Sequence, residues 1–286
     1  RLIPDVHTDC ALWMGAIHGQ GAATIWVWER TYNKESDFEG SILHRPENVI
    51  AVGRAGLDLM RLAPEVNKLQ QTKTPIAILY STTAQIWSQR AHTAMCKAHE
   101  ALTFAGYPIR FISELQICEG KLSKYKVVVL PSVRHIPDNV VSALQKFAAN
   151  GGKLWIIGDE EFGKDEHGQP RAKVSLPANS IARFSEDTAQ SDLRDQFMAE
   201  MKRLDIAPSV QIKTTDNKDP WAVEYRSVKS GNQTLVSAVN YWGTPKKVKI
   251  TISGKSPKQM TDLRTGKHYT SNTITLQPLQ SVLLKM

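Results

Sequence analysis

The chain has 286 residues, of which 41% are hydrophobic and 22% are charged, and these values are typical of a globular protein of one large domain or two to three smaller ones. No apolar run approaches the roughly 18 residues that a membrane-spanning helix needs, so we expect a soluble protein of the cytoplasm or the periplasm with no membrane partner. Three cysteines, Cys10, Cys96 and Cys118, exclude a disulfide scaffold, and the net charge of +8 raises the question of a nucleic-acid partner.

The first zone, residues 1–71, is expected to form a helix that ends near Gly19, one strand, and a second helix from about Glu47 to Leu69. The run Ala22–Trp28 lacks polar alternation, which predicts a strand buried on both faces. Such a strand needs neighbours on both edges. Either it joins the sheet of the next zone, or it belongs to a domain whose other strands precede this chain. The buried face of the second helix is expected to carry Val49, Val52, Leu57, Met60 and Leu62.

The second zone, residues 72–207, alternates short apolar strands with amphipathic helices. This alternation predicts a doubly wound parallel sheet of flavodoxin type, and so an α/β fold class. The expected strands are Pro75–Tyr80, Pro108–Ser113, Lys126–Pro131 and Lys153–Gly158. The expected helices are Ser81–Ala105, Pro137–Asn150 and Asp192–Leu204.

The third zone, residues 208–286, contains strand-like stretches separated by turn signals, which predicts a small antiparallel β-sandwich. The expected strands are Val210–Thr214, Ala222–Val228, Thr234–Asn240, Lys247–Ile252, Gln259–Asp262, Ile274–Leu276 and Ser281–Lys285. The whole excess of positive charge lies here. Because the lysines alternate with apolar residues, as in Lys246–Ile252, we interpret them as the solvent-facing side of a sheet and expect no nucleic-acid partner.

The doubly wound zone shows neither a nucleotide motif nor a catalytic cysteine. A phosphate-binding loop needs glycines after the first strand, but Tyr80 is followed by Ser-Thr-Thr-Ala, so we expect no cofactor. A glutaminase-like nucleophile needs a cysteine on a tight turn with a histidine nearby. Cys96 lies inside a predicted helix and Cys118 precedes Glu119-Gly120 without a strand before it. Both cysteines are therefore interpreted as inert.

Metal binding is also not expected. His92 and His99 are seven residues apart on one predicted helix, but they lack the carboxylate–histidine spacing of a zinc site. The acidic loop that follows Asp159 lies at the carboxyl end of a strand, where ligands usually bind, although an ordinary polar loop is the simpler interpretation. It carries Glu160, Glu161, Asp165, Glu166 and His167.

The segment Trp26-Val27-Trp28-Glu29-Arg30 offers the best candidate for substrate contacts. Tryptophan presents a flat apolar face to a sugar ring, while Glu29 and Arg30 can hydrogen-bond hydroxyl groups. Such a cluster at the carboxyl end of a barrel strand is where substrates bind. A core tryptophan with a flanking ion pair is the alternative. We therefore predict Trp26, Trp28, Glu29 and Arg30 as substrate-binding residues.

Several short motifs, in the same order along the chain, resemble glycoside hydrolase family 42, the β-galactosidases with a barrel, a trimerisation domain and a small β-domain. Residues 12–28 resemble the last helix and strand of the barrel, although Trp28-Glu29-Arg30 departs from the expected Trp-Arg pair. Residues 75–158 resemble the glutaminase-like trimerisation domain, which lacks its cysteine nucleophile. The terminal β-domain is matched by Asn240-Tyr241-Trp242, Asp262–Gly266 and Leu276–Leu279.

The resemblance implies that residues 1–71 end a β/α barrel, 72–207 form a trimerisation-type domain and 208–286 a β-sandwich. It implies a bacterial retaining glycosidase that acts on an oligosaccharide or β-galactoside, assembled as a trimer-like homo-oligomer. The two catalytic carboxylates of such an enzyme come from earlier barrel strands. This chain then lacks both, the catalytic residues are unknown, and Glu29 lies on the wrong strand. Two alternatives stay open: a non-catalytic oligomerisation or carbohydrate-binding module, and a stand-alone α/β enzyme whose first zone completes the doubly wound sheet.

Overall fold

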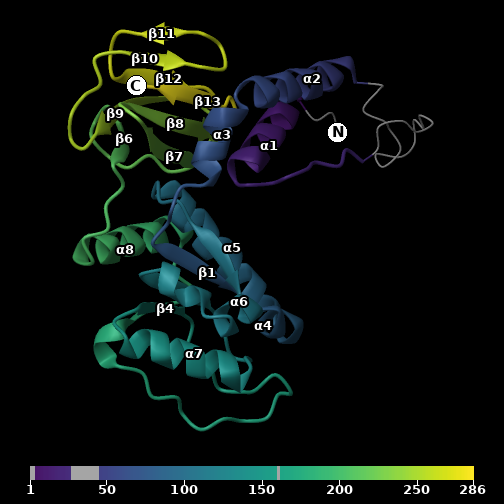
Figure 1. Cartoon of the computed structure of the whole chain (residues 1–286), viewed down its shortest axis with the longest axis vertical. Helices are drawn as coiled ribbons and strands as arrows, with labels where there is room; N and C mark the ends of the chain where they lie inside the picture. The colour runs from purple at the N-terminus through teal and green to yellow at the C-terminus, as the bar shows by residue number, and fades with distance from the viewer. Residues whose placement is uncertain (1–3, 27–44, 160–161) are drawn as a thin grey trace. The chain divides into compact units, whose positions relative to one another are not determined.

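The computed structural model describes residues 4–26, 45–159 and 162–286 of the chain. It divides into two compact units (Figure 1). The α/β unit comprises Lys73–Pro208, and the β unit combines Arg1–Thr72 with Ser209–Met286. The helices of the first zone therefore pack with the strands of the last zone. No helix within the described ranges is long and apolar enough to cross a membrane.

The α/β unit is built on a parallel five-stranded sheet with the order β2-β1-β3-β4-β5, the flavodoxin-like order that the sequence predicts. Its strands are β1 (Ile76–Tyr80), β2 (Arg110–Ser113), β3 (Val127–Pro131), β4 (Lys153–Ile157) and β5 (Ile181–Phe184). Its helices are α4 (Thr82–Trp87), α5 (Gln89–Phe104), α6 (Glu114–Cys118), α7 (Asp138–Ala149) and α8 (Gln190–Arg203), with 3-10 turns at Lys121–Lys124 and Ala178–Ser180.

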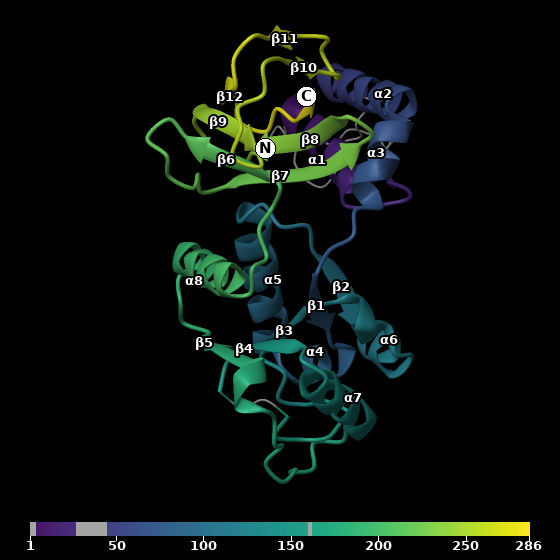
Figure 2. The ribbon, with the colours of Figure 1, turned by 60° about the vertical axis from the view of Figure 1, so that its left-hand side comes forward.

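Helices cover both faces of this sheet, so it is doubly wound (Figure 2). Side chains from alternate positions of β3 point to opposite sides: Val127 and Val129 join the core under α5 and α8, whereas Val128 and Leu130 join the core under α6 and α7. Strands buried on both faces are continuous apolar runs, and such runs allow the strands to be predicted from the sequence. None of the described residues before Lys73 joins this sheet, which argues against a first zone that completes it.

Three details of the α/β unit differ from the sequence expectation. The long helix expected over 81–105 is broken at Ser88, whose hydroxyl accepts from the Arg90 backbone N–H and starts α5. Helix α6 and strand β5 were not predicted. A capping box between Ser113 and Gln116 stabilises the first turn of α6. This pattern can be recognised in a sequence, but the helix is only five residues long.

The β unit contains two antiparallel sheets, with the orders β11-β10-β13-β8-β7 and β12-β9-β6, which agree with the predicted sandwich. The strands are β6 (Val210–Thr214), β7 (Val223–Ser230), β8 (Gln233–Asn240), β9 (Lys246–Ile252), β10 (Met260–Asp262), β11 (His268–Tyr269), β12 (Thr273–Leu276) and β13 (Val282–Lys285). Along β9, Val248 and Ile250 are buried while Lys247 and Lys249 are exposed, so the predicted solvent-facing lysine pattern is confirmed.

The larger sheet of the β unit is covered on its second face by helices α1 (Asp5–Ile17), α2 (Pro46–Arg61) and α3 (Ala63–Gln70). Val236 of β8 points into the sandwich core, whereas the next apolar position on the other face, Val239, contacts the helix cluster. Trp13 of α1 is fully buried in that cluster. The helices are thus part of the hydrophobic core of the β unit.

Two expectations for the first zone were wrong. Residues 22–26 form no strand and are mostly exposed, and no strand among the described residues pairs with them. The second helix is two helices, and of the five apolar residues expected on one side of it only Leu62 is buried. Leu57 and Met60 are 69% and 77% exposed, whereas the small side chains Ala51 and Ala55 are buried and let α2 approach α1 closely.

Candidate functional site

The predicted substrate-binding segment is only partly visible in the structure. Trp26 lies in a turn after α1 and exposes 87% of its surface, so it is not a core residue. Trp28, Glu29 and Arg30 lie outside the described residues. A large aromatic side chain that is almost fully exposed is available to contact a ligand or another part of a protein.

A buried polar network fixes the chain where it leaves α1 toward Trp26. His18 Nε2 lies 2.5 Å from Glu224 Oε1, and Arg226 Nη2 donates to His18 Nδ1 at 2.8 Å. Tyr241 donates its hydroxyl to Glu224 Oε2 at 3.1 Å. Glu224 and Arg226 occupy alternate positions of β7, and both are buried on the side of the helices.

The hydrogen bonds of this network define the state of each group. An arginine can only donate, so His18 Nδ1 must accept, and its Nε2 must carry the proton that it shares with the Glu224 carboxylate. Burial, and then the negative charge of Glu224, raise the pKa of Tyr241 well above its usual value, so the phenol stays a donor. The network therefore links His18 to the buried pair of Glu224 and Arg226, which suits positioning of the backbone.

A second charged cluster ties the helices to the β-sandwich. Arg264 Nη2 donates to Asp9 Oδ1 at 2.7 Å and Arg264 Nε donates to Asp58 Oδ2 at 3.1 Å. The guanidinium also lies over the ring of Trp13, 4.4 Å from its centroid. Because Asp9 and Asp58 come from different helices, one buried arginine joins α1, α2 and the β10–β11 turn.

The three cysteines are distributed over both units of the structure. Cys96 lies on α5 and Cys118 ends α6, both exposed, while Cys10 is buried in the β unit. His92 Nε2 lies 3.6 Å from Cys96 Sγ, and the His99 ring stacks on Phe111 instead of facing a carboxylate cluster. In the described ranges, no group of three His, Cys, Asp or Glu residues has the geometry to hold a metal ion.

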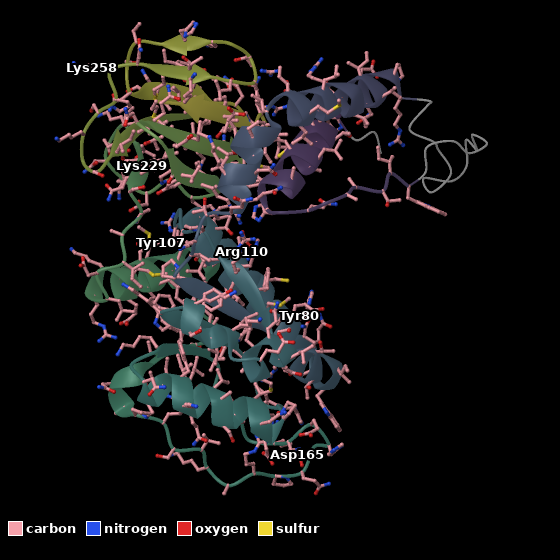
Figure 3. The ribbon with its side chains drawn as sticks, viewed as in Figure 1. Tyr80, Tyr107, Arg110, Asp165, Lys229 and Lys258 are labelled. Carbon is pink, nitrogen blue, oxygen red and sulfur yellow. The ribbon has the colours of Figure 1, made fainter. Side chains whose placement is uncertain are left out.

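The acidic loop after β4 is organised by its own backbone. Asp165 (labelled in Figure 3) accepts from the backbone N–H groups of His167 and Gln169 at 2.9 and 2.7 Å. Glu166 and His167 are exposed. Glu160 and Glu161 lie outside the described residues. Asp165 therefore shapes a turn, as expected of an ordinary polar loop.

Thiol reactivity should separate the three cysteines. Burial raises the pKa of the Cys10 thiol, so that fewer thiolates form there at a given pH. We expect two thiols per chain, Cys96 and Cys118, to react rapidly with a disulfide reagent near pH 8, and Cys10 to react only after denaturation. Counting released chromophore before and after adding guanidinium measures this. Rapid reaction of all three thiols in the folded protein would contradict the burial of Cys10.

Comparison with known proteins was made at the level of sequence and of structure. No protein-family model matches the sequence, and a search of curated proteins finds no match. Solved structures do match. The exo-carrageenase GH42 from Bacteroides ovatus aligns over 99% of this chain and 39% of its own, with a TM-score of 0.79 and 22% identity.

Two β-galactosidases align similarly. A catalytic mutant of Gan42B, a GH42 β-galactosidase from G. stearothermophilus, covers 99% of this chain and 51% of its own, with a TM-score of 0.70 and 14% identity. The β-galactosidase from Rahnella sp. R3 covers 100% and 52%, with a TM-score of 0.71 and 12% identity. The resemblance to family 42 is thus confirmed as a likeness of fold. The chain spans about two fifths to one half of the length of these enzymes, consistent with a C-terminal portion of one.

Proposed function

We propose that this chain is the C-terminal part of a retaining, family 42-like glycoside hydrolase that acts on β-galactosidic bonds of an oligosaccharide. The observation that carries the proposal is the fold likeness, which covers 99–100% of this chain but only 39–52% of each enzyme chain. In this proposal the rest of the barrel, with two carboxylates about 5 Å apart, belongs to a polypeptide segment before Arg1.

An apolar face of α2 that the described residues leave exposed supports the proposal of a barrel that packs against this chain. Ile50, Leu57 and Met60 are 58%, 69% and 77% exposed and lie seven and ten residues apart, on one side of the helix. Three large apolar side chains on one side of a helix are usually covered by another part of the protein or by a partner. We assign the barrel as the element that covers this face.

The predicted segment gives the chain its part in substrate binding. In the proposal, Trp26, Trp28, Glu29 and Arg30 form the last barrel strand once its neighbours are present. Trp28 or Trp26 then stacks on a sugar ring, and Glu29 and Arg30 hydrogen-bond its hydroxyl groups. The His18–Glu224–Arg226 network supports this role, because it anchors the chain only eight residues before Trp26.

The α/β unit is proposed to be a glutaminase-like domain that mediates a trimer-like assembly. Large apolar side chains are exposed on the edge strand β2, at the end of β1 and on α4 and α6, namely Phe111, Tyr80, Ile86 and Leu115. Burial of such a face against another subunit gains hydrophobic free energy. Light scattering that gives the mass of a monomer at micromolar concentration would argue against this assembly.

Activity assays of the chain and of a longer polypeptide test the main proposal. The 286-residue chain alone is expected to release no product from a nitrophenyl β-galactoside or from carrageenan oligosaccharides. The polypeptide that also includes the upstream barrel is expected to hydrolyse one of them. Activity of the short chain that is lost in the Glu29→Gln variant would overturn the proposal. Absence of an upstream barrel in the reading frame would favour the non-catalytic module.

Charge placed on the α2 face should distinguish a covered surface from a solvent-facing one. In the 286-residue chain, Leu57→Glu with Met60→Glu should change the free energy of unfolding by no more than about 0.5 kcal/mol, because both side chains are exposed. In the longer polypeptide the same pair should lower the melting temperature by several degrees. Asn67→Glu, at an exposed position on α3, serves as the control in both the 286-residue chain and the longer polypeptide. Equal melting temperatures of the longer polypeptide and its double variant would exclude this face as the barrel contact.

A further inference from the structure

A cavity of about 870 Å³ opens at the carboxyl edge of the parallel sheet of the α/β unit. Residues that follow β3, β4 and β5 line it, together with residues of the corner between α4 and α5. Ligands of doubly wound sheets bind at this edge, near the point where the strand order reverses, which here lies between β1 and β3. The volume is in the range of small-molecule sites.

The wall of the cavity carries equal numbers of positive and negative side chains. The cations are Arg90, Lys97 and Arg134, and the anions are Asp159, Glu186 and Asp187. Within the described part of the chain, the side chains of Arg90, Asp159 and Asp187 make no hydrogen bond or ion pair. Donors and acceptors are thus both available to a ligand, and the charges of the described lining residues balance.

A tryptophan provides the apolar surface of the cavity. Trp87 stacks on His135 with ring centroids 4.8 Å apart and planes at 9°, and its indole N–H donates to the Glu166 carbonyl at 3.0 Å. Gly168 lies so close that an added Cβ would come within 3.1 Å of the indole ring. Trp87 is held in place by these contacts and still exposes 50% of its surface.

The backbone at this edge is held in an unusual conformation. Ser132, the first residue after β3, has a φ of +49°, which costs free energy for a residue other than glycine. Its hydroxyl donates to the Glu186 carboxylate, and Lys97 Nζ donates to the Glu186 carbonyl at 2.5 Å. A Cβ at Gly158 would lie 2.4 Å from Glu186 Oε1. Strained residues that are cross-linked in this way concentrate at ligand sites.

We propose that this cavity binds a neutral saccharide of one or two rings. Hydroxyl groups both donate and accept, so a sugar can satisfy carboxylates that only accept and guanidinium groups that only donate. An aromatic ring such as Trp87 packs on the C–H face of a pyranose. The balanced charge of the wall and the lack of glycine between β1 and α4 disfavour a nucleotide or a simple phosphate. The proposal rests on the residues that line this cavity.

The test uses the whole 286-residue chain and titrates it with D-galactose or lactose. Saturation-transfer NMR and tryptophan fluorescence are expected to report saturable binding of at least one sugar. Trp87→Ala and Asp159→Ala should each weaken it by about tenfold or more. The matched controls are Trp242→Ala, which removes an equally exposed tryptophan of the β unit, and Asp216→Ala in an exposed turn, and both should bind as the parent does.

Circular dichroism verifies that each variant is folded. Asp159→Ala removes no contact within the described structure, so it remains informative even if Trp87→Ala unfolds the domain. The proposal is overturned if neither sugar saturates the protein below about 50 mM, or if binding persists unchanged in the folded Asp159→Ala and Trp87→Ala variants. It is equally overturned if inorganic sulfate or phosphate binds in the cavity and the neutral sugars do not.

Discussion

Replacement of Arg264 by methionine should lower the free energy of unfolding by about 3–5 kcal/mol. The side chain of Arg264 is only 6% exposed, and its two carboxylate partners, Asp9 and Asp58, are 14% and 15% exposed. Methionine fills part of the same volume over Trp13 but cannot donate hydrogen bonds. The variant therefore leaves two poorly hydrated carboxylates without the guanidinium that links them.

The measurement is urea denaturation followed by circular dichroism, with Arg61→Met as the matched control. Arg61 also donates to Asp58, at 2.7 Å, but its side chain is 52% exposed, so its loss should cost about 0–1 kcal/mol. Changing Asp9 and Asp58 to asparagine in the Arg264→Met background should recover part of the loss, because no buried negative charge remains. Equal losses in the free energy of unfolding for the two arginine variants would mean that burial of this cluster does not contribute to stability.

The fold of the α/β unit could be predicted from the sequence because its information is local. Strands such as β3 (Val127–Pro131) are buried on both faces and are therefore continuous apolar runs. Breaks in helices were harder to predict. The Ser88 hydroxyl caps the start of α5 by accepting from the Arg90 backbone N–H, but serine also occurs inside helices, so its presence alone does not mark a break.

The association of the first and last zones could not be predicted. Trp13 on α1 reaches Ser237 on β8, and His18 reaches Glu224, in each case across more than 200 residues. No local pattern encodes such a partner. The prediction for α2 failed for a related reason. Its large apolar residues Leu57 and Met60 are exposed, whereas the small residues Ala51 and Ala55 are buried.

Some residues of the candidate site had a local signal in the sequence and others had none. An aromatic residue at the end of an apolar run is recognisable, and the structure shows Trp26 exposed; its contact with a substrate stays a prediction. Glu224 and Arg226 had one local signal, since two opposite charges at alternate positions of the predicted strand 222–228 would face the same side. The cavity beside Trp87 had none, because it is assembled from five separate loops and helix ends.

Replacement of Glu224 by alanine should lower the free energy of unfolding by about 3–5 kcal/mol. The change removes the carboxylate that accepts from His18 and Tyr241 and that lies 3.8 Å from the buried Arg226. Urea denaturation measures the loss. Tyr241→Phe, which removes only one donor to that carboxylate, should cost about 1–3 kcal/mol, and Glu119→Ala, at an exposed position, should cost less than about 0.5 kcal/mol.

A double-mutant cycle distinguishes a coupled network from independent contacts. If Glu224 and His18 act through their shared hydrogen bond, then His18→Leu should cost much less in the Glu224→Ala background than in the parent protein, with a coupling free energy of about 1–3 kcal/mol. The same coupling should restrict the chain after Gly19, because side-chain hydrogen bonds hold His18 only eight residues before Trp26. Amide exchange of residues 19–26 should therefore accelerate in Glu224→Ala and remain unchanged in Glu119→Ala. If the losses in the free energy of unfolding are additive and the amide exchange of residues 19–26 is unchanged, the contacts act independently and do not influence the segment that carries Trp26.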